Sequence, residues 1–332
     1  MNVPLSVSIV LVTYNSAAVV GDALESWARF LPEAETVVVD NGSRDNTLAI
    51  VERRGVDRVV SGHGNVGFGA GVNRGARVAN GSLLLVANPD VVATAVDRDE
   101  LRLLADREPV GIRGCIDARS PRALLPRRWG VRAELLWGLT TWFLVPRELH
   151  LQRPRWGRRG SRARWVPGSA FIVSREEFLV VGGFDEQLFL YFEDVDLSRR
   201  YEDRGLPIGA TRAASVTHSP HSSSPREEEL MTACALLSLF QYTATWEGRS
   251  KADRLAALAM RLLAALQRLG VLTARVPRLG TRAARKSASA EAVRRLLLAS
   301  GADGIPPGAY ADARSALALA ERRRSAHSGA HQ

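Results

Sequence analysis

The stretch VSIVLVTYN at residues 7–15 starts the pattern that decides the fold. Its first six residues form a β-branched apolar run, which is typical of a strand buried on both faces. Thr13, Tyr14 and Asn15 follow as a polar turn, and apolar residues then recur at helical spacing as far as Trp27. These residues predict a strand, a turn and a helix in succession.

The same unit repeats further along the chain. The predicted elements are, in order, a strand over 36–39, a helix over 45–54, a short strand near 59, a glycine-rich stretch over 62–71, a helix over 73–79 and a strand over 83–87. Strands that alternate with helices at this spacing form βαβ units. We therefore predict an α/β fold with a mainly parallel, Rossmann-like central sheet.

Polar residues stand at the predicted carboxyl ends of these strands. Asp40 follows the second strand, and Asn88-Pro89-Asp90 follows the fourth. Ligands bind at that edge of an open α/β sheet, although capping and turn formation would explain each residue taken singly. A dinucleotide fold is excluded because no G-x-G-x-x-G follows the first strand, and no P-loop sequence occurs.

The rest of the chain changes character several times. Residues 112–164 have poor periodicity and predict an irregular, basic insertion. The predicted elements beyond it are a strand over 165–173 broken at Pro167-Gly168, helices over 176–181 and 195–204, and a strand over 214–217 that ends at His218. We predict an α/β domain over 1–225 and a basic helical region over 226–332, with about the last ten residues disordered.

The net charge of +10 comes from two basic segments on an acidic body. Residues 112–164 contain 13 basic and 3 acidic side chains, and residues 248–332 contain 16 and 5. Such segments indicate a localised anionic partner, either a diphosphate or a membrane face. Nucleic acid is disfavoured because the tail's arginines are not interleaved with aromatic residues.

Two segments invite a membrane interpretation, and each has a plain alternative. Residues 135–145 and 255–269 are apolar between or around arginines, which suits either an interfacial helix or ordinary packing. No stretch is long enough for a transmembrane helix, and we expect no secretory signal. Cys115 and Cys234 offer no disulfide or zinc pattern, so we expect a cytoplasmic protein.

Three carboxylates, Glu193, Asp194 and Asp196, stand at the start of a predicted helix beside an aromatic and apolar run. Successive residues in a helical turn diverge, so at least one can face a cleft while another caps the helix. Like charges beside apolar groups raise proton affinity, which suits a general base.

A second chemical feature is Asp90, which follows a strand and the rigid Pro89. A carboxylate there can hold a hard divalent cation whose other ligands are water and a substrate diphosphate. His218 can supply a further ligand, with His221 as the nearby alternative.

Six blocks of this sequence, in order, resemble the family 2 glycosyltransferases of the GT-A fold, most of all their actinobacterial rhamnosyl-transferring members. The blocks are VSIVLVTYN (7–15), VVVDNGSRDNT (37–47), GNVGFGAGVNRG (64–75), LLLVANPDV (83–91), WVPGSAFIVSREEF (165–178) and VGGFDEQLFLYFEDVDLSRR (181–200). The resemblance covers about residues 5–222 and implies a nucleotide-sugar transferase with a C-terminal helical extension.

The resemblance implies a role for each matching residue. The nucleotide-sugar donor would be bound by Thr13, Tyr14, Asn15, Asp40, Asn65, Gly67, Asn73, Asn88 and Asp90. Asp194 would be the catalytic base, Asp90 and His218 would hold Mn²⁺ or Mg²⁺, and the acceptor would lie against Trp165, Gly168, Ser169 and Glu193. Asn88 replaces the first Asp of the usual Asp-x-Asp metal motif.

The reaction so implied is inverting transfer of L-rhamnose from dTDP-rhamnose to a polyprenyl-diphosphate-linked GlcNAc at the inner face of the plasma membrane. UDP-galactofuranose and UDP-GlcNAc remain alternative donors, and a non-catalytic nucleic-acid- or membrane-binding scaffold is the alternative of another class. The expected partners are the donor, the lipid-linked acceptor and an anionic membrane surface. A homodimer stays open.

Overall fold

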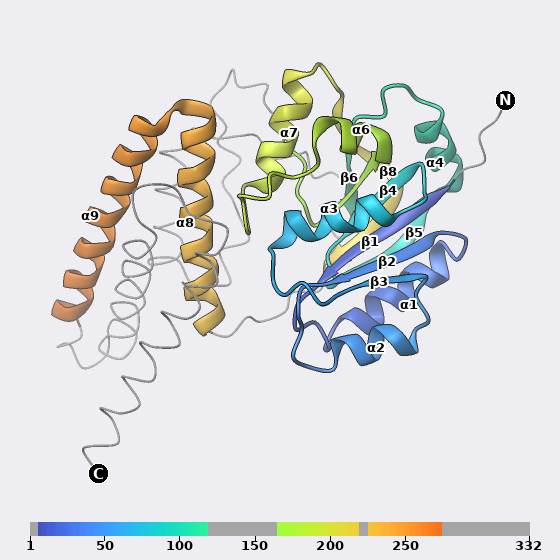
Figure 1. Cartoon of the computed structure of the whole chain (residues 1–332), viewed down its shortest axis with the longest axis horizontal. Coiled ribbons are helices and arrows are strands. Elements are labelled where there is room, and N and C mark those ends of the chain that lie inside the picture. The colour runs from blue at the N-terminus through green and yellow to red at the C-terminus, as the bar shows by residue number, and fades with distance from the viewer. Residues whose placement is uncertain (1–5, 119–164, 219–224, 274–332) are drawn as a thin grey trace, which may run out of the picture. The chain divides into compact units, whose positions relative to one another are not determined.

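The computed structural model describes residues 6–118, 165–218 and 225–273 (Figure 1). Within them the chain forms two compact units, one of 6–118, 165–189 and 193–218, the other of 190–192 and 225–273. The segment expected to be an irregular insertion, from residue 119 on, and the expected disordered end lie outside the described residues. The domain boundary near residue 225 stays a prediction.

The first unit is an eight-stranded sheet with helices (Figure 1). Its elements are β1 (Val7–Thr13), α1 (Val20–Phe30), β2 (Glu35–Asp40), α2 (Thr47–Arg53), β3 (Arg58–Val60), α3 (Phe68–Val78), β4 (Leu83–Ala87), β5 (Val91–Val96), α4 (Arg98–Ala105), β6 (Ile112–Asp117), β7 (Ala170–Ser174), α6 (Arg175–Val181), α7 (Glu193–Asp203) and β8 (Ile208–His218). The strand order is β3-β2-β1-β4-β7-β6-β8-β5.

The predicted parallel sheet is correct for one half of this order. Strands β3, β2, β1 and β4 pair in parallel, as the βαβ pattern requires. The other half is mixed, because β7 runs antiparallel to β4 and β6, and β5 runs antiparallel to β8. Apolar periodicity indicates that a strand is buried but carries no information about the direction of its neighbour. The antiparallel pairs could therefore not be predicted from the sequence pattern.

Several predicted boundaries are wrong. Helix α3 begins at Phe68 instead of residue 73, so Gly69 and Gly71 lie inside the helix, where a Cβ at Gly71 would stand 2.8 Å from Val12 Cγ1. Strand β6 lies in a segment that was expected to be irregular, and β7 starts only at Ala170, after the Pro-Gly break. Strand β8 begins at Ile208, six residues earlier than expected. Close packing of α3 on the sheet outweighs the low helix propensity of glycine.

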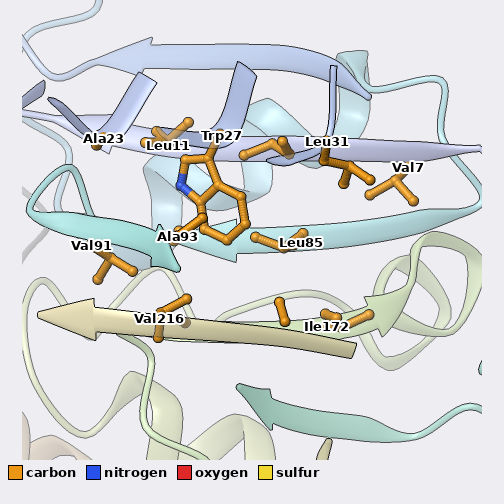
Figure 2. Close-up of a cluster of buried hydrophobic side chains, with 14 of the residues drawn as sticks. Val7, Leu11, Ala23, Trp27, Leu31, Leu85, Val91, Ala93, Ile172 and Val216 are labelled. Atoms are coloured by element: carbon orange, nitrogen blue, oxygen red, sulfur yellow. The ribbon is translucent and has the colours of Figure 1, made fainter. Parts of the chain in front are cut away.

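A tryptophan centres the core on one face of the sheet (Figure 2). Trp27 of α1 is fully buried among side chains from β1, β4 and β5, which include Leu11, Leu85 and Ala93. Burying one aromatic residue of this size stabilises the fold by about 3 kcal/mol. The core therefore fixes α1 across the strands whose carboxyl ends carry the predicted site.

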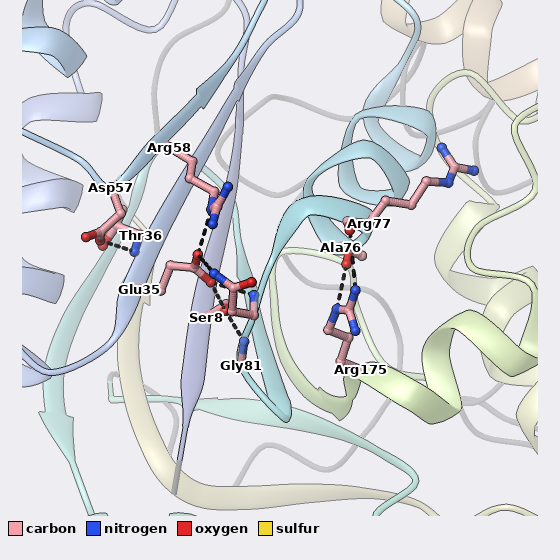
Figure 3. A network of polar contacts seen from close by, with 10 residues as sticks. Ser8, Glu35, Thr36, Asp57, Arg58, Ala76, Arg77, Gly81 and Arg175 are labelled. Carbon is pink, nitrogen blue, oxygen red and sulfur yellow. Dashed lines mark hydrogen bonds and ion pairs between the residues drawn. The ribbon is translucent and has the colours of Figure 1, made fainter.

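At the opposite edge, a carboxylate ties the amino ends of the strands together (Figure 3). Glu35, the first residue of β2, accepts hydrogen bonds from Ser8 Oγ, Arg58 Nε and the backbone N–H of Asn80 at 2.5, 2.8 and 2.7 Å. Burial alone would raise the pKa of Glu35, but these hydrogen bonds outweigh it and lower that pKa. Both oxygens of the Glu35 carboxylate therefore accept hydrogen bonds that hold the sheet together.

The second unit contains α8 (Pro225–Glu247) and α9 (Arg249–Thr273), which pack against each other. The hydroxyl of Ser238 on α8 donates to the carbonyl of Leu190 at 2.9 Å, and the rings of Phe192 and Tyr242 stand 5.8 Å apart. In the part of the chain that the structure describes, no helix is long and apolar enough to cross a membrane.

Candidate active site

The ends of β1 and β2 are joined by Asp40, which is 1% exposed. Its carboxylate accepts four hydrogen bonds: from Thr13 Oγ1 at 2.9 Å, from Ser43 Oγ at 2.5 Å, and from the backbone N–H groups of Gly42 and Ser43 at 3.1 and 2.9 Å. Asp40 thereby fixes the turn after β2 and the last residue of β1. Its first role is structural, and the predicted contact with the nucleotide stays a prediction.

The loop after β1 is bound to the loop after β2. Asn15 adopts a left-handed backbone with φ of 51°, donates its N–H to Ser43 Oγ at 2.9 Å and accepts the N–H of Arg44 on its side-chain oxygen at 2.8 Å. The backbone N–H of Tyr14 donates to Ser16 Oγ at 3.2 Å. Thr13 and Asn15 are therefore tied to Asp40 and the turn after β2, with Tyr14 between them; these four residues form a cross-linked edge, and donor binding by them stays a prediction.

Two further residues of this edge were missed by the sequence analysis. Asn41 is 3% exposed and donates its amide to the carbonyl of Gly67 at 2.9 Å, while His63 Nε2 lies 3.1 Å from Asn41 Oδ1. Asn65 in turn accepts the N–H of Gly67 at 3.1 Å. Asn41 stands in the turn after β2 and His63 in the glycine-rich stretch, and neither carries a local signal, so only the long-range contact reveals them.

Asn73, which the resemblance assigned to donor binding, makes hydrogen bonds within the fold. Its amide donates to the carbonyl of Phe184 at 2.9 Å and to Glu186 at 3.0 Å, and its oxygen accepts the N–H of Phe184 at 2.8 Å. At 3% exposed, it clamps α3 to the turn that follows α6. Donor binding by Asn73 stays a prediction, and the geometry gives this side chain a structural function.

The structure brings Asp90 and His218 together although they lie far apart in the sequence. Val91 pairs with His218 across β5 and β8, and His218 Nε2 stands 3.4 Å from Asp90 Oδ2. Two ligands of one octahedral cation lie about 3 Å apart, and a carboxylate with an imidazole suits Mn²⁺ or Mg²⁺. The pair therefore fits a divalent cation. Within the described ranges no larger group of His, Cys, Asp and Glu gathers, and His221 lies outside them.

A short backbone segment links this pair to the carboxylates of α7. The N–H of Asn88 donates to the carbonyl of Ser169 at 2.9 Å, and the N–H of Gly168 donates to Asp194 Oδ2 at 3.0 Å. A Cβ at Gly168 would stand 3.5 Å from Asp194 Cβ and 3.2 Å from the ring of Phe68, so a glycine suits this close approach. Residues 168–169 thus connect the end of β4 with the first turn of α7.

Trp165 leads into the same segment. It precedes Val166, whose N–H donates to Ser198 Oγ on α7 at 3.0 Å. The residues assigned to the acceptor side, Trp165, Gly168, Ser169 and Glu193, therefore belong to two chain segments that are hydrogen-bonded to each other. Contact with an acceptor stays a prediction.

Glu193 and Asp194 have very different surroundings although they are neighbours. Glu193 is 5% exposed, and its Oε2 is buried with no hydrogen-bond partner among the described residues. Burial and the adjacent Asp194 raise the pKa of Glu193 well above its ordinary value. Of the two neighbouring carboxyl groups, Glu193 is therefore the one whose surroundings favour the protonated form.

The backbone just before this pair is strained. Tyr191 and Phe192 have φ angles of 70° and 64°, which are rare for bulky residues. Such conformations cost on the order of 1–3 kcal/mol each and cluster at functional sites. The two strained residues thus directly precede the buried Glu193 and the proposed base Asp194 in the sequence.

Comparison with known proteins agrees with this geometry. The profile of glycosyl transferase family 2 matches residues 8–129. The N-acetylglucosaminyl-diphospho-decaprenol L-rhamnosyltransferase of Mycobacterium tuberculosis is 31% identical over 249 residues, which are 65% of this chain and 76% of that protein. The O-antigen biosynthesis protein RfbC of Myxococcus xanthus is 30% identical over 235 residues, 67% of this chain and 17% of that protein.

A solved structure shows the same fold. The mannosyltransferase PcManGT of Pyrobaculum calidifontis, in complex with GDP-Man and Mn²⁺, superposes with a TM-score of 0.51 at 17% identity, covering 87% of this chain and 86% of that one. The predicted GT-A fold is therefore confirmed. With a mycobacterial relative matched over three quarters of its length and the motif blocks assembled at one edge of the sheet, the chain belongs to glycosyl transferase family 2.

Proposed function

We propose that this glycosyltransferase moves L-rhamnose from dTDP-rhamnose to a GlcNAc carried on a polyprenyl diphosphate, with inversion at the anomeric carbon. The rhamnosyl group and the acceptor follow the name of the mycobacterial relative, an N-acetylglucosaminyl-diphospho-decaprenol L-rhamnosyltransferase, and the dTDP carrier follows from the resemblance of the motif blocks. The observation that carries the proposal is the hydrogen-bonded path from Asn88 through Ser169 and Gly168 to Asp194. This path connects the proposed base to the Asn88-Pro89-Asp90 motif through two backbone N–H groups.

Asp194 is proposed as the general base. Single displacement needs one group that accepts the proton of the acceptor hydroxyl as its oxygen attacks the anomeric carbon from the face opposite the leaving group. The Gly168 N–H orients Asp194, and the adjacent Glu193 is the carboxyl group of the pair that burial favours in its neutral form. No enzyme nucleophile is required, in contrast to retaining hydrolases.

Asp90 and His218 are proposed as the protein ligands of Mn²⁺ or Mg²⁺, supported by the 3.4 Å between their side-chain atoms. When bound, the cation would neutralise charge that develops on the leaving nucleoside diphosphate. Asp90 is 20% and His218 45% exposed at the side chain, so both remain accessible to a ligand.

The donor's base and ribose are assigned to the cross-linked edge formed by Thr13, Tyr14, Asn15 and Asp40. Because Asp40 uses its oxygens within the fold, we expect the nucleotide to contact backbone groups and exposed side chains such as Asn15 more than Asp40 itself. We place the acceptor against residues 165–169 and α7, and the protein at the inner face of the plasma membrane, where a polyprenyl diphosphate is presented.

A donor panel tests the proposal. The full chain is incubated with Mn²⁺ or Mg²⁺, a short-chain polyprenyl-diphosphate GlcNAc, and dTDP-rhamnose, UDP-galactofuranose or UDP-GlcNAc, and product is quantified by mass spectrometry. We expect turnover with dTDP-rhamnose to exceed that with either UDP donor, and NMR of the product to give an inverted anomeric configuration. Preference for a UDP donor would overturn the assigned sugar, and a retained configuration would overturn the mechanism.

A further inference from the structure

Helix α9 carries a row of arginines on its exposed side. Arg254, Arg261 and Arg268 are all exposed and follow one another at intervals of seven residues. Seven residues turn an α-helix to within about 20° of two full turns, so the three side chains leave the helix in nearly one direction. At 1.5 Å per residue, this arginine row is about 21 Å long.

The seven-residue interval continues in the sequence. Arg275 and Arg282 extend it beyond the described residues, and no Asp or Glu occurs between Asp253 and Glu291. A spacing kept over so many residues, without any acidic side chain, differs from the mixed charges of an ordinary solvated helix face.

No ion pair neutralises the arginine row among the described residues of the second unit. Arg249 pairs with Asp253, and Lys251 pairs with Glu247, but Arg254 donates only to the hydroxyl of Ser250, at 2.7 Å. Among the described residues, no carboxylate forms an ion pair with Arg254, Arg261 or Arg268. The positive charge of the row is therefore available to an external anion.

The surroundings of the row favour lipid over nucleic acid. Leu258, four residues after Arg254 and so on the same side of the helix, is partly exposed, as is Leu262, while Leu255 and Leu263 are buried. Residues 249–273 contain no aromatic side chain that could stack on a base. Arginines whose stems lie next to partly exposed leucines can bind headgroups while the leucines reach the acyl boundary.

We propose that the exposed face of α9, formed by Arg254, Arg261 and Arg268 with Leu258 and Leu262, docks on the anionic phospholipid headgroups of a membrane. The proposal deepens the proposed function, on which it rests only for the expectation that the acceptor is presented in a membrane. Membrane docking by α9 is a function separate from that of the proposed catalytic residues.

Vesicle co-sedimentation of the full chain tests this docking. We compare vesicles of phosphatidylcholine alone with vesicles containing three parts in ten of phosphatidylglycerol, for the wild type and for the triple variant Arg254→Gln, Arg261→Gln, Arg268→Gln. We expect the triple Arg→Gln variant to lose affinity for the anionic vesicles by on the order of 100-fold, because each arginine near an anionic surface contributes to binding. The triple Arg→Lys variant keeps the three positive charges and should retain binding. Transfer to a water-soluble acceptor analogue should stay unchanged in both variants.

Two control variants separate the arginine row from total charge. Arg29→Gln, Arg53→Gln, Arg102→Gln removes three exposed charges from the first unit, and Arg278→Gln, Arg285→Gln, Lys286→Gln removes three from the tail outside the seven-residue series. We expect both to lose much less affinity than the α9 variant. Equal losses, unchanged binding of the α9 variant, binding to pure phosphatidylcholine, or tighter binding to duplex DNA than to anionic vesicles would each overturn the proposal. A chain that binds vesicles but transfers no sugar would refute only the proposed function.

Discussion

Two buried carboxylates of the same unit, Asp40 and Glu193, have opposite environments. Asp40, at the end of β2, accepts four hydrogen bonds and ties two loops together. Glu193, at the start of α7, is almost as buried, but one of its oxygens has no partner among the described residues and the backbone before it is strained. The carboxylate of Asp40 is fully hydrogen-bonded within the fold, whereas Glu193 is buried with one oxygen that lacks a partner among the described residues.

The contrast separates residues that build the site from residues that act in it. A buried polar group whose bonds are all made inside the protein contributes to stability. A buried group left unsatisfied costs free energy, and natural proteins keep such groups where function needs them. We therefore expect substitutions near Asp40 to affect unfolding, and substitutions in the first turn of α7 to affect turnover.

The largest expected effect is on catalysis. Asp194→Asn keeps an oxygen that can accept the Gly168 N–H but removes the proposed base, so kcat should fall by roughly 10³-fold while the Kd of the nucleoside diphosphate changes little. Steady-state kinetics and isothermal titration calorimetry measure the two quantities. Asp203→Asn, an exposed position on the same helix, is the matched control. Transfer retained within about tenfold would remove Asp194 from the mechanism.

The next effect is on stability. Asp40→Ala leaves two hydroxyl groups and two backbone N–H groups without their acceptor, so the free energy of unfolding should fall by about 3 kcal/mol. Urea denaturation measures it, with Asp203→Ala expected to stay within about 0.5 kcal/mol of the wild type. If Asp40→Ala is as stable as the wild type but binds the donor weakly, Asp40 contacts the nucleotide and the contrast with Glu193 does not hold.

A third prediction concerns the pair across β5 and β8. His218→Ala should raise the Mn²⁺ concentration needed for half-maximal activity by about tenfold or more, because it removes one of two proposed protein ligands. His221→Ala should change it little. Electron paramagnetic resonance of Mn²⁺ in the presence of nucleoside diphosphate gives a readout independent of turnover. A larger effect of the second variant would move the ligand to His221.

The smallest effect is a pH dependence of stability. Because the folded pKa of Glu193 lies above its ordinary value of 4.5, the folded state holds a proton that the unfolded state has lost, and the free energy of unfolding must fall as pH rises above 4.5. Glu193→Gln removes this dependence. The variant should gain stability relative to the wild type as pH rises from 4.5 to 8 in urea denaturation. Parallel pH curves for the two proteins would show that Glu193 is not held protonated.

The sequence predicted much of this site for an identifiable reason. Local patterns placed Thr13, Asp40 and Asp90 at strand ends, and the first strands, β1 to β4, were found because apolar runs and turn residues are short-range signals. The direction of β7, the early start of α3 and the links made by Asn41 and Asn73 were not found. Each depends on a contact between residues far apart in the chain, which periodicity does not encode.

Local periodicity and ordered motif blocks are enough to identify the α/β class, the family and the residue types at the carboxyl edge of the sheet. Which of these residues have their hydrogen bonds occupied within the fold depends on packing between distant parts of the chain. The tertiary structure joined Asp90 to His218 through antiparallel pairing, gave Asp194 the Gly168 N–H, and left Glu193 buried beside it. Hydrogen bonding and burial are properties of packed neighbours, so they exist only once the chain has folded.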